Sequence, residues 1–229
     1  MLPAIVAIEI KQVEERKMCM KINQLIEETT YIDNLLVRKA TIADAEALQR
    51  LFHEYLGTHK DYEIRNIIGR FESEDIFVAV IDDEHIIGAL TIVKIISRGE
   101  TDLNITKDGG IVIGCINAIS IGDKRVFFGD DIKYNLGDLC VDDAYRYKGV
   151  ATVLLECAIS EMHDPAYALV WAPGGEVRAQ YLWESHGFEQ QEVVKNLGVL
   201  LPDFCAKCVE RNYGCNYCDV HVYVKKNRI

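Results

Sequence analysis

The most constraining feature of this sequence is the stretch GDLCVDDAYRYKGVATVLLECAI, residues 137–159. It runs from a short apolar segment, through a polar and basic turn with one glycine, into a strongly apolar helical pattern. Unpaired backbone N–H groups and the positive end of the helix dipole meet where a strand enters a helix in this way. Gly149 has no Cβ that would block a close approach. The stretch therefore predicts a phosphate-binding turn between a strand and a helix.

The charge and composition of the chain limit the classes of molecule that it is expected to bind. A formal net charge of −11 repels nucleic acid phosphates and favours cationic partners such as amines. The apolar first residues, MLPAIVAIEI, lack a cationic leader, and the longest apolar run, GGIVIGCINAISIG, is too short and glycine-rich for a membrane span. We therefore expect a cytoplasmic protein with no nucleic acid or membrane partner, whose eight cysteines are thiols or metal ligands rather than disulfides.

Hydrophobic spacing predicts one main domain. Residues 1–34 form an N-terminal extension with helical periodicity, and residues 35–229 follow the order strand, helix, helix, hairpin, long insertion, strand, helix, strand, helix, strand. The insertion, residues 97–134, contains apolar runs on both sides of GDK that predict an extra hairpin. Strands joined by crossing helices predict an α/β (α+β) fold, with a mixed sheet and helices on both faces.

Two motifs carry a resemblance to a known family. Arg146-x-x-Gly149-x-Ala151 follows a strand and opens a helix, and AQYLWESHGF follows at residues 179–188. The first resembles the acetyl-CoA-binding signature of the GNAT N-acetyltransferase superfamily, and the second resembles that family's Ala-x-x-Leu/Phe-Tyr-x-x-x-Gly-Phe motif. The resemblance covers roughly residues 35–188 and the closing VHVYVKK. It implies a GNAT-like splayed sheet and an N-acyltransferase that moves an acetyl group from acetyl-CoA to an amine.

The same resemblance implies a cofactor site. The pyrophosphate of CoA would lie on the turn, with two basic side chains adding mobile cations. The pantetheine arm would pair like a strand where the sheet splays, and the thioester carbonyl would find a backbone donor there. The implied residues are Arg146, Tyr147, Lys148, Gly149, Val150 and Ala151 for the turn, and Leu139, Cys140 and Val141 for the strand.

Catalytic candidates come from the needs of amine acetylation. A general base must deprotonate the amine, and Asp138 is the first candidate, because alternation puts it on the same strand face as Cys140. A turn or capping role after Gly137 is the alternative for Asp138. An acetyl-cysteine intermediate at Cys140 is an alternative to direct attack by the amine.

The second motif departs from the family. Trp183 stands where many relatives carry a tyrosine that protonates the departing thiolate, and an indole N–H supplies no usable proton. Tyr181 is our substitute for the acid, and His186 is a further candidate. The departure also keeps another reading open, a non-catalytic CoA-binding module that acts through a partner.

Four cysteines near the C-terminus have the spacing of a metal site. They follow the pattern C-x2-C-x6-C-x2-C, which places four thiolates around one tetrahedral centre. We predict structural Zn2+ that ties residues 203–219 together, with an iron–sulfur cluster or a redox pair as alternatives. The predicted ligands are Cys205, Cys208, Cys215 and Cys218.

The sequence leaves the acceptor open. Small amines, amino acids, peptide N-termini and protein lysines all fit, because no specificity code is readable in the segments that would build the pocket. A homodimer is also compatible with this sequence.

Overall fold

The computed structural model describes residues 32–82, 84–95, 102–105, 111–112, 115–121, 124–127, 132–163, 165–173, 179–196 and 218–226. Within these ranges, eight strands form one sheet in the order β1–β2–β3–β8–β10–β12–β11, with β9 paired to β3. Neighbours are antiparallel except β8 and β10, which run parallel. The strands are β1 (Leu35–Lys39), β2 (Glu74–Ile81), β3 (His85–Lys94), β8 (Tyr134–Leu136), β9 (Cys140–Val141), β10 (Ala166–Pro173), β11 (Glu189–Val194) and β12 (Cys218–Lys225).

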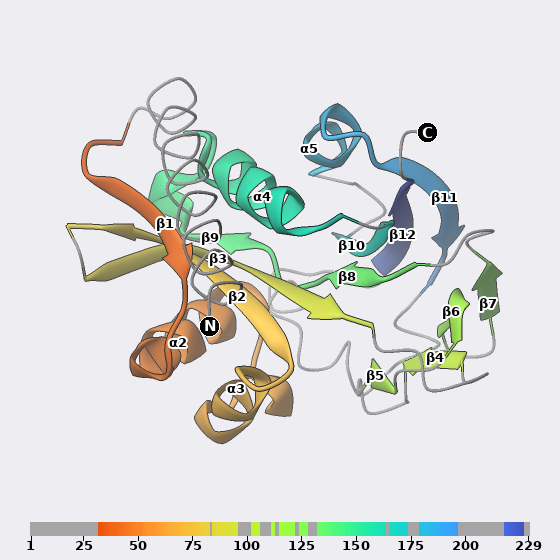
Figure 1. The fold of residues 1–229 in the computed structure, drawn as a ribbon, viewed down its shortest axis with the longest axis horizontal. Coiled ribbons are helices and arrows are strands. Elements are labelled where there is room, and N and C mark those ends of the chain that lie inside the picture. The colour runs from red at the N-terminus through yellow and green to blue at the C-terminus, as the bar shows by residue number, and fades with distance from the viewer. Residues whose placement is uncertain are drawn as a thin grey trace, which may run out of the picture.

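Helices cover both faces of this sheet, which confirms the predicted mixed α/β layering. α4 and α5 lie on one side, and α2 and α3 lie on the other (Figure 1). Two separate clusters of buried side chains match these two layers. The helices are α2 (Ala45–Tyr55), α3 (Ile64–Arg70), α4 (Val150–Glu161) and α5 (Gln180–Ser185), with short 3-10 turns η1 (Ile42–Asp44), η2 (Lys60–Tyr62) and η3 (Asp143–Tyr145).

The apolar face of α4 packs on the sheet as its spacing predicts. Each of its predicted core side chains is at most 1% exposed, and a fully buried aliphatic side chain of this size stabilises the fold by about 1.5–3 kcal/mol. This packing fixes the start of α4 beside β9. The buried side chains of this face are Val150, Val153, Leu154, Cys157 and Ala158.

An ion pair fixes the start of α2 against β1. Arg38 donates two hydrogen bonds to the carboxylate of Asp44, at 2.7 and 2.8 Å. Asp44 also accepts the backbone N–H of Thr41 at 2.7 Å. Thr41 and Asp44 form a capping box at η1, and Asp44 occupies the N-cap position of α2. The hydrogen bonds from Arg38 lower the pKa of Asp44 to about 2.

The long insertion lies between two paired strands. Lys94 at the end of β3 faces Tyr134 at the start of β8, and Ile95 donates its N–H to the carbonyl of Lys133 at 2.8 Å. Between these ends a second sheet has the order β5–β4–β6–β7, and its β6–β7 pair is the predicted extra hairpin. Its strands are β4 (Asp102–Ile105), β5 (Ile111–Val112), β6 (Cys115–Ile121) and β7 (Lys124–Phe127).

The structure adds one strand to the predicted order and leaves most of the predicted N-terminal extension undescribed. The final β-strand is preceded by β11, which the sequence reading missed and which forms the sheet edge beside β12. The N-terminal extension predicted for residues 1–34 lies, up to residue 31, outside the residues that the structure describes. Among the helices of the described part, none is both long and apolar enough to cross a membrane.

Candidate active site

The turn between β9 and α4 contains two residues in the left-handed region of backbone conformation. Tyr147 has φ 62°, and Gly149, the N-cap of α4, has φ 85°. Glycine adopts this conformation without steric cost, so Gly149 lets the chain enter α4 here. Just upstream, Asp142 accepts the backbone N–H of Ala144 at 2.8 Å and begins η3. Asp142 therefore helps to shape the turn.

The backbone N–H groups of this turn are available to a ligand. No acceptor in the described part of the chain takes a hydrogen bond from the N–H of Tyr147, Lys148 or Gly149. The first N–H groups of α4, from Val150 onward, have no partner inside the helix either. The side chain of Tyr147 is fully exposed to solvent. Unpaired donors at the positive end of a helix suit an anion, so the amides from Tyr147 to Ala151 fit a pyrophosphate.

The side chain of Arg146 contacts the end of β9, the turn and α2. Its Nε donates to the carbonyl of Val141 at 3.2 Å, and its Nη1 lies 2.7 Å from the carboxylate of Asp143. The guanidinium also lies over the ring of Tyr55, 5.3 Å from the centroid. Arg146 therefore joins the end of β9 to the turn. Lys148 lies over the ring of Tyr145 at 5.3 Å.

The strand before this turn is broken by a bulge. β3 pairs Ile92 with Leu136 of β8 and Ala89 with Cys140 of β9. Between these pairs, residues 137–139 face only two residues of β3, so one residue is extra and the strand bends. Gly137 donates its N–H to the carbonyl of Thr91 at 3.0 Å inside this bulge.

The sheet splays open at the bulge. β10 pairs with β8 from Ala166 to Ala168 and then continues to Pro173 without a partner on that side among the described strands. β9 pairs with β3 alone, so the edge of β9 that faces β10 is free in the same part of the chain. This free edge is the segment that the sequence assigns to the pantetheine arm.

Cys140 lies in this segment but is a poor nucleophile. Its side chain is 6% exposed, and burial raises the pKa of its thiol well above the ordinary range. The neighbouring carboxylate of Asp138 raises it further. Because the thiolate is the reactive form of cysteine, a thiol with a raised pKa is a weak nucleophile at neutral pH.

Asp138 extends from the bulge towards α3. Its Oδ1 accepts a hydrogen bond from the hydroxyl of Tyr62 at 2.7 Å, and its Oδ2 lies 2.5 Å from Nη2 of Arg70. Cys140 belongs to the buried cluster of α2 and α3, so the predicted shared face of Asp138 and Cys140 is confirmed. The side chain of Asp138 bonds across to α3 instead of capping the turn after Gly137.

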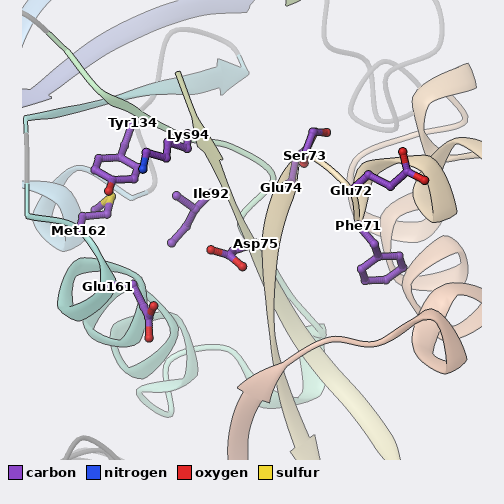
Figure 2. A pocket seen from close by; sticks show the side chains of 10 residues that line it. All are labelled: Phe71, Glu72, Ser73, Glu74, Asp75, Ile92, Lys94, Tyr134, Glu161 and Met162. Atoms are coloured by element: carbon purple, nitrogen blue, oxygen red, sulfur yellow. The ribbon is translucent and has the colours of Figure 1, made fainter. Parts of the chain in front are cut away.

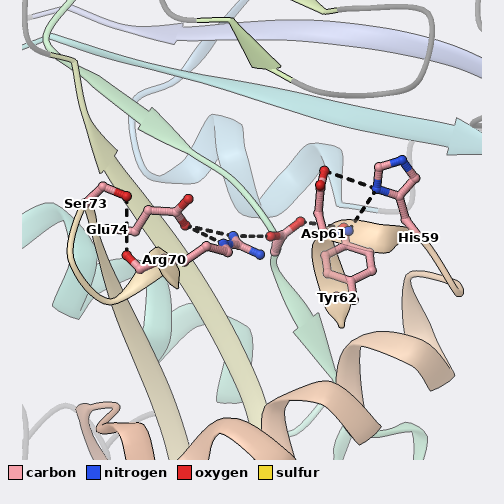
Figure 3. A network of polar contacts seen from close by, with 7 residues as sticks. His59, Asp61, Tyr62, Arg70, Ser73 and Glu74 are labelled. Atoms are coloured by element: carbon pink, nitrogen blue, oxygen red, sulfur yellow. Dashed lines mark hydrogen bonds and ion pairs between the residues drawn. The ribbon is translucent and has the colours of Figure 1, made fainter. Parts of the chain in front are cut away.

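Arg70 also binds Glu74 and thereby links two carboxylates. Its Nε and Nη2 both lie 2.8 Å from Oε2 of Glu74 (Figure 3). Burial lowers the pKa of Arg70, but the two carboxylates outweigh burial and raise it. Burial raises the pKa of Glu74, and Arg70 offsets part of that effect. Burial and the charge of Asp138 raise the pKa of Tyr62, so Tyr62 remains a neutral hydrogen-bond donor.

Trp183 is a core residue at the end of α5. It is 4% exposed, and its ring packs edge-on against Phe188 with 5.1 Å between centroids. The N–H of Phe188 donates to the carbonyl of Trp183 at 3.1 Å, and the N–H of Gly187 donates to that of Glu184 at 3.0 Å. With φ 80° at Gly187, these bonds form the predicted glycine helix end.

The two candidate substitutes for the acid lie in different environments. Tyr181 is 85% exposed, in the first turn of α5. The side chain of His186 is 8% exposed, and its Nε2 lies 3.1 Å from Glu156 of α4. Its Nδ1 lies 2.6 Å from the carbonyl of Leu182. His186 therefore joins α5 to α4, whereas Tyr181 remains open to solvent.

Figure 2 shows a pocket of about 340 Å³ whose lining contains no residue of the glycine turn. It is lined by residues 71–75, by the ends of β3 and β8, and by the last residues of α4. α4 has 12 residues, so the pocket and the turn are separated by about 18 Å of helix. Lys39 binds two carboxylates of the lining, Asp75 at 3.2 Å and Glu161 at 3.3 Å. We therefore place the candidate site at the turn and bulge rather than in this pocket.

The predicted zinc site falls mostly outside the described residues. Cys205, Cys208 and Cys215 lie there, and only Cys218 is described. Cys218 is 5% exposed and begins β12, where it pairs with Pro173 of β10. The four-cysteine metal site stays a prediction.

Sequence reasoning missed the partners of Asp138. Tyr62, Arg70 and Glu74 come from a segment more than 60 positions earlier in the chain, so no local pattern links them to the bulge. The spacing of Arg70 and Glu74, four residues apart with opposite charge, was the one available signal.

Comparisons with known proteins agree with this geometry. Residues 72–190, more than half of the chain, match the family described as the acetyltransferase (GNAT) domain. No curated protein sequence matches. Similar solved structures include an N-acetyltransferase from Staphylococcus aureus Mu50, with 15% identity, a TM-score of 0.54, and coverage of 85% of this chain and 99% of that one.

Two further structures were solved with CoA species. Arabidopsis thaliana NAA60 in complex with acetyl-CoA has 15% identity and a TM-score of 0.53, covering 84% of this chain and 98% of that one. The NatC complex bound to Gag peptide and CoA has 15% identity and a TM-score of 0.53, covering 85% and 99%. At this identity these likenesses show the fold, and the family match supplies the assignment. The chain belongs to the GNAT acetyltransferase family.

Proposed function

We propose that this protein is an N-acyltransferase that moves an acetyl group from acetyl-CoA to an amine by direct attack. The observation that carries the proposal is the turn from Tyr147 to Ala151, whose N–H groups have no acceptor in the described part of the chain and stand at the start of α4 beside the open edge of β9. An anion site next to an unpaired strand edge suits a ligand with a pyrophosphate and an extended amide-containing arm.

The co-substrate would be held by backbone groups. The amides of Tyr147, Lys148, Gly149, Val150 and Ala151 would bind the pyrophosphate, and the edge from Leu139 to Val141 would pair with the pantetheine amides. Arg146 would act by fixing the turn to β9, because its guanidinium is bonded to the carbonyl of Val141. Lys148 would supply the more mobile charge.

Asp138 is the proposed general base. A carboxylate has about four acceptor positions, and Tyr62 and Arg70 fill two of them. The side chain is 20% exposed, so the remaining positions are within reach of an amine or a bridging water. Asp138 would take a proton from the ammonium, and the free amine would then attack the thioester carbon.

The attack forms a C–N bond and breaks the C–S bond. The tetrahedral intermediate carries an oxyanion, which a backbone N–H of the bulge would stabilise. As the intermediate collapses, the attacking nitrogen gives its second proton to solvent water, and the departing thiolate takes up a proton. The exposed Tyr181 or water would supply that proton, since Trp183 is packed in the core and its indole donates no usable proton.

The acceptor is proposed only by class. The acidic chain favours a cationic amine, either a small molecule or the amine of a peptide or protein. The NatC complex, which shares the fold, is bound to a peptide, and this keeps a peptide acceptor among the candidates. Structural Zn2+ on Cys205, Cys208, Cys215 and Cys218 would stabilise the segment before β12.

A second candidate function rests on Trp183. Its burial in the position of the usual acid also suits a module that binds CoA without transferring the acetyl group and acts through a partner at the cysteine segment.

Release of free CoA thiol from acetyl-CoA, measured with a panel of small amines and peptides, separates the two functions. We expect amine-dependent thiol release and an acetylated product detected by mass spectrometry. Tight acetyl-CoA binding without any amine-dependent release would favour the binding module. Loss of both binding and release would contradict both functions.

A further inference from the structure

Three charged side chains form a partly buried row beside the bulge. Arg70 lies between Glu74 and Asp138, at 2.8 Å and 2.5 Å from their carboxylate oxygens. The side chains are 15%, 14% and 20% exposed, in that order. One cation shared by two carboxylates leaves the row with a net charge of −1.

The elements around Arg70 hold the guanidinium in this position. Arg70 is the last residue of α3, and Glu74 is the first residue of β2, so the pair closes the turn between them. The guanidinium lies over the ring of Phe52, 5.8 Å from its centroid. Tyr62 packs against the same ring at 5.2 Å and donates to Asp138. Asp138 is thereby oriented from two sides.

Because Arg70 is also paired with Glu74, its electrostatic effect on Asp138 is weaker than in a simple ion pair. A cation that pairs with one carboxylate alone favours its ionised form strongly and makes it a weak proton acceptor. Glu74 takes two of the contacts of Arg70, from Nε and Nη2, and adds a second negative charge nearby. Both effects offset the positive charge that Arg70 presents to Asp138.

We propose that Arg70 is a positioning residue for acetyl transfer: it fixes the Asp138 carboxylate at the bulge, while Glu74 shares its charge and keeps Asp138 able to accept a proton. This inference rests on the proposed role of Asp138 as base. It adds two residues, from α3 and β2, to the machinery of the reaction.

Other titratable groups that act on this row are few in the described part of the chain. Tyr62 and Cys140 interact with Asp138, and burial keeps both neutral by raising their pKa. Asp61 interacts with Glu74. Arg146 interacts with Cys140 from the far end of β9. Arg70 contacts Glu74 and Asp138 directly, and so it connects the two carboxylates.

The test is a carbon-13 NMR titration of protein labelled at the aspartate carboxyl carbons, with Asp138 assigned by its loss in Asp138→Asn. Arg70→Met should raise the midpoint for Asp138 by about 1–3 pH units, because a neighbouring cation is removed. Glu74→Gln should lower the midpoint, because a negative charge is removed and Arg70 keeps its hydrogen-bond acceptor. Glu72→Gln is the matched control, a charge loss two residues away on an exposed side chain, and should leave the midpoint in place.

Shifts of opposite sign in Arg70→Met and Glu74→Gln support the charge sharing. Shifts no larger than that of Glu72→Gln, or of the same sign, overturn it. If Arg70→Met does not fold, the comparison of Glu74→Gln with Glu72→Gln decides alone.

The link to the reaction needs a second readout. With an amine from the panel, the acidic limb of the pH–rate profile should move with the NMR midpoint in each variant, while the KM for acetyl-CoA stays unchanged. Shifted midpoints with an unmoved profile would make the row purely structural. The titration requires no turnover, so failure of the proposed function and failure of the charge sharing give different results.

Discussion

Thr91 Oγ1 lies 2.7 Å from the point where a Cβ on Gly137 would stand. Thr91 is fully buried, and its hydroxyl has no hydrogen-bond partner in the described part of the chain. Two residues along β3, Ala89 belongs to the buried cluster that includes Cys140, so alternation puts Thr91 on the face of Asp138. The bulge that carries the proposed base therefore has a hydroxyl directly against its first residue.

The first prediction is that Gly137→Ala lowers kcat. The added methyl group would stand 2.7 Å from Thr91 Oγ1, so either the buried Thr91 side chain or the bulge must shift. We expect the bulge to move, and small displacements of a catalytic group cost about 10- to 100-fold in rate. Thr91→Ala removes the colliding oxygen and should restore much of the rate in the double variant. Steady-state kinetics of the two single variants and the double variant measure this. A double variant as slow as Gly137→Ala would show that the contact is not the cause.

The second prediction concerns Gly149. A valine at this position is strained at φ 85° and brings a branched side chain to the N–H groups of the turn. Gly149→Val should weaken acetyl-CoA binding by well over tenfold, with the fold largely intact. Calorimetry measures the affinity, and circular dichroism checks the fold. Unchanged affinity in a folded variant would remove the pyrophosphate assignment.

The third prediction is that Asp138→Asn lowers kcat by about 100-fold or more with little change in acetyl-CoA affinity. The amide keeps one acceptor oxygen for Arg70 or Tyr62, and it does not accept a proton from the amine. The pH–rate profile of the unmodified protein should show a clear acidic limb and at most a weak alkaline one. Normal turnover by Asp138→Asn would leave Asp138 with a structural role alone.

The fourth prediction is about stability and pH. The pKa of Asp44 falls from 3.8 to about 2 in the folded state, so its pairing with Arg38 stabilises the fold above about pH 4. That stabilisation is lost as the pH falls through about 2. Asp44→Asn should lower the free energy of unfolding at pH 7 by on the order of 1–2 kcal/mol, since Arg38 is partly exposed.

Urea unfolding between pH 2 and pH 7 tests this, and the gap between the two proteins should close towards pH 2. Asp75→Asn, at an exposed pair with Lys39, is the matched control and should cost less than about 0.5 kcal/mol. Equal effects of Asp44→Asn and Asp75→Asn would argue against the Arg38 pair as the cause.

The fifth prediction concerns the metal. Protein purified under reducing conditions should contain about one zinc per chain, and Cys208→Ser should lose it. Structural zinc in small modules binds with an apparent free energy of about 10–16 kcal/mol. Because Cys218 begins β12, chelation should increase hydrogen exchange at the start of that strand. Elemental analysis that finds no metal, together with two disulfides, would contradict the site.

The sequence predicted the fold well where one face of an element is apolar. The face of α4 and the β2–β3 hairpin have strong periodic signals, and both are found. β11 was missed because its sequence, EQQEVV, is polar where it lies exposed at the sheet edge. The bulge between Gln190 and Glu192 also breaks its alternation. An edge strand of this kind is held by backbone hydrogen bonds to β12. Such bonds do not depend on the side chains, so the hydrophobic pattern of the sequence does not indicate them.

The candidate site was predictable only in its local part. The turn around Gly149 is one continuous segment, so the spacing of its residues in the sequence predicts its local backbone geometry. The contact between Asp138 and Arg70 joins residues 68 positions apart, and a single sequence contains no sign of such a pairing. The contact of Arg146 with Tyr55 could not be predicted for a similar reason, since Tyr55 lies near it only in the folded chain.

The pairing of Lys94 with Tyr134 has a consequence for how this protein can change over evolution. The two ends of the insertion are neighbours in the same ladder, joined again by the bond from Ile95 to Lys133. The chain between them can therefore lengthen, shorten or be exchanged without pulling β3 and β8 apart, because loop length adds only a slowly growing entropic cost. Such changes of length need not alter the positions of the core strands or of the bulge. The segment can thus vary during evolution without disturbing the residues of the proposed site.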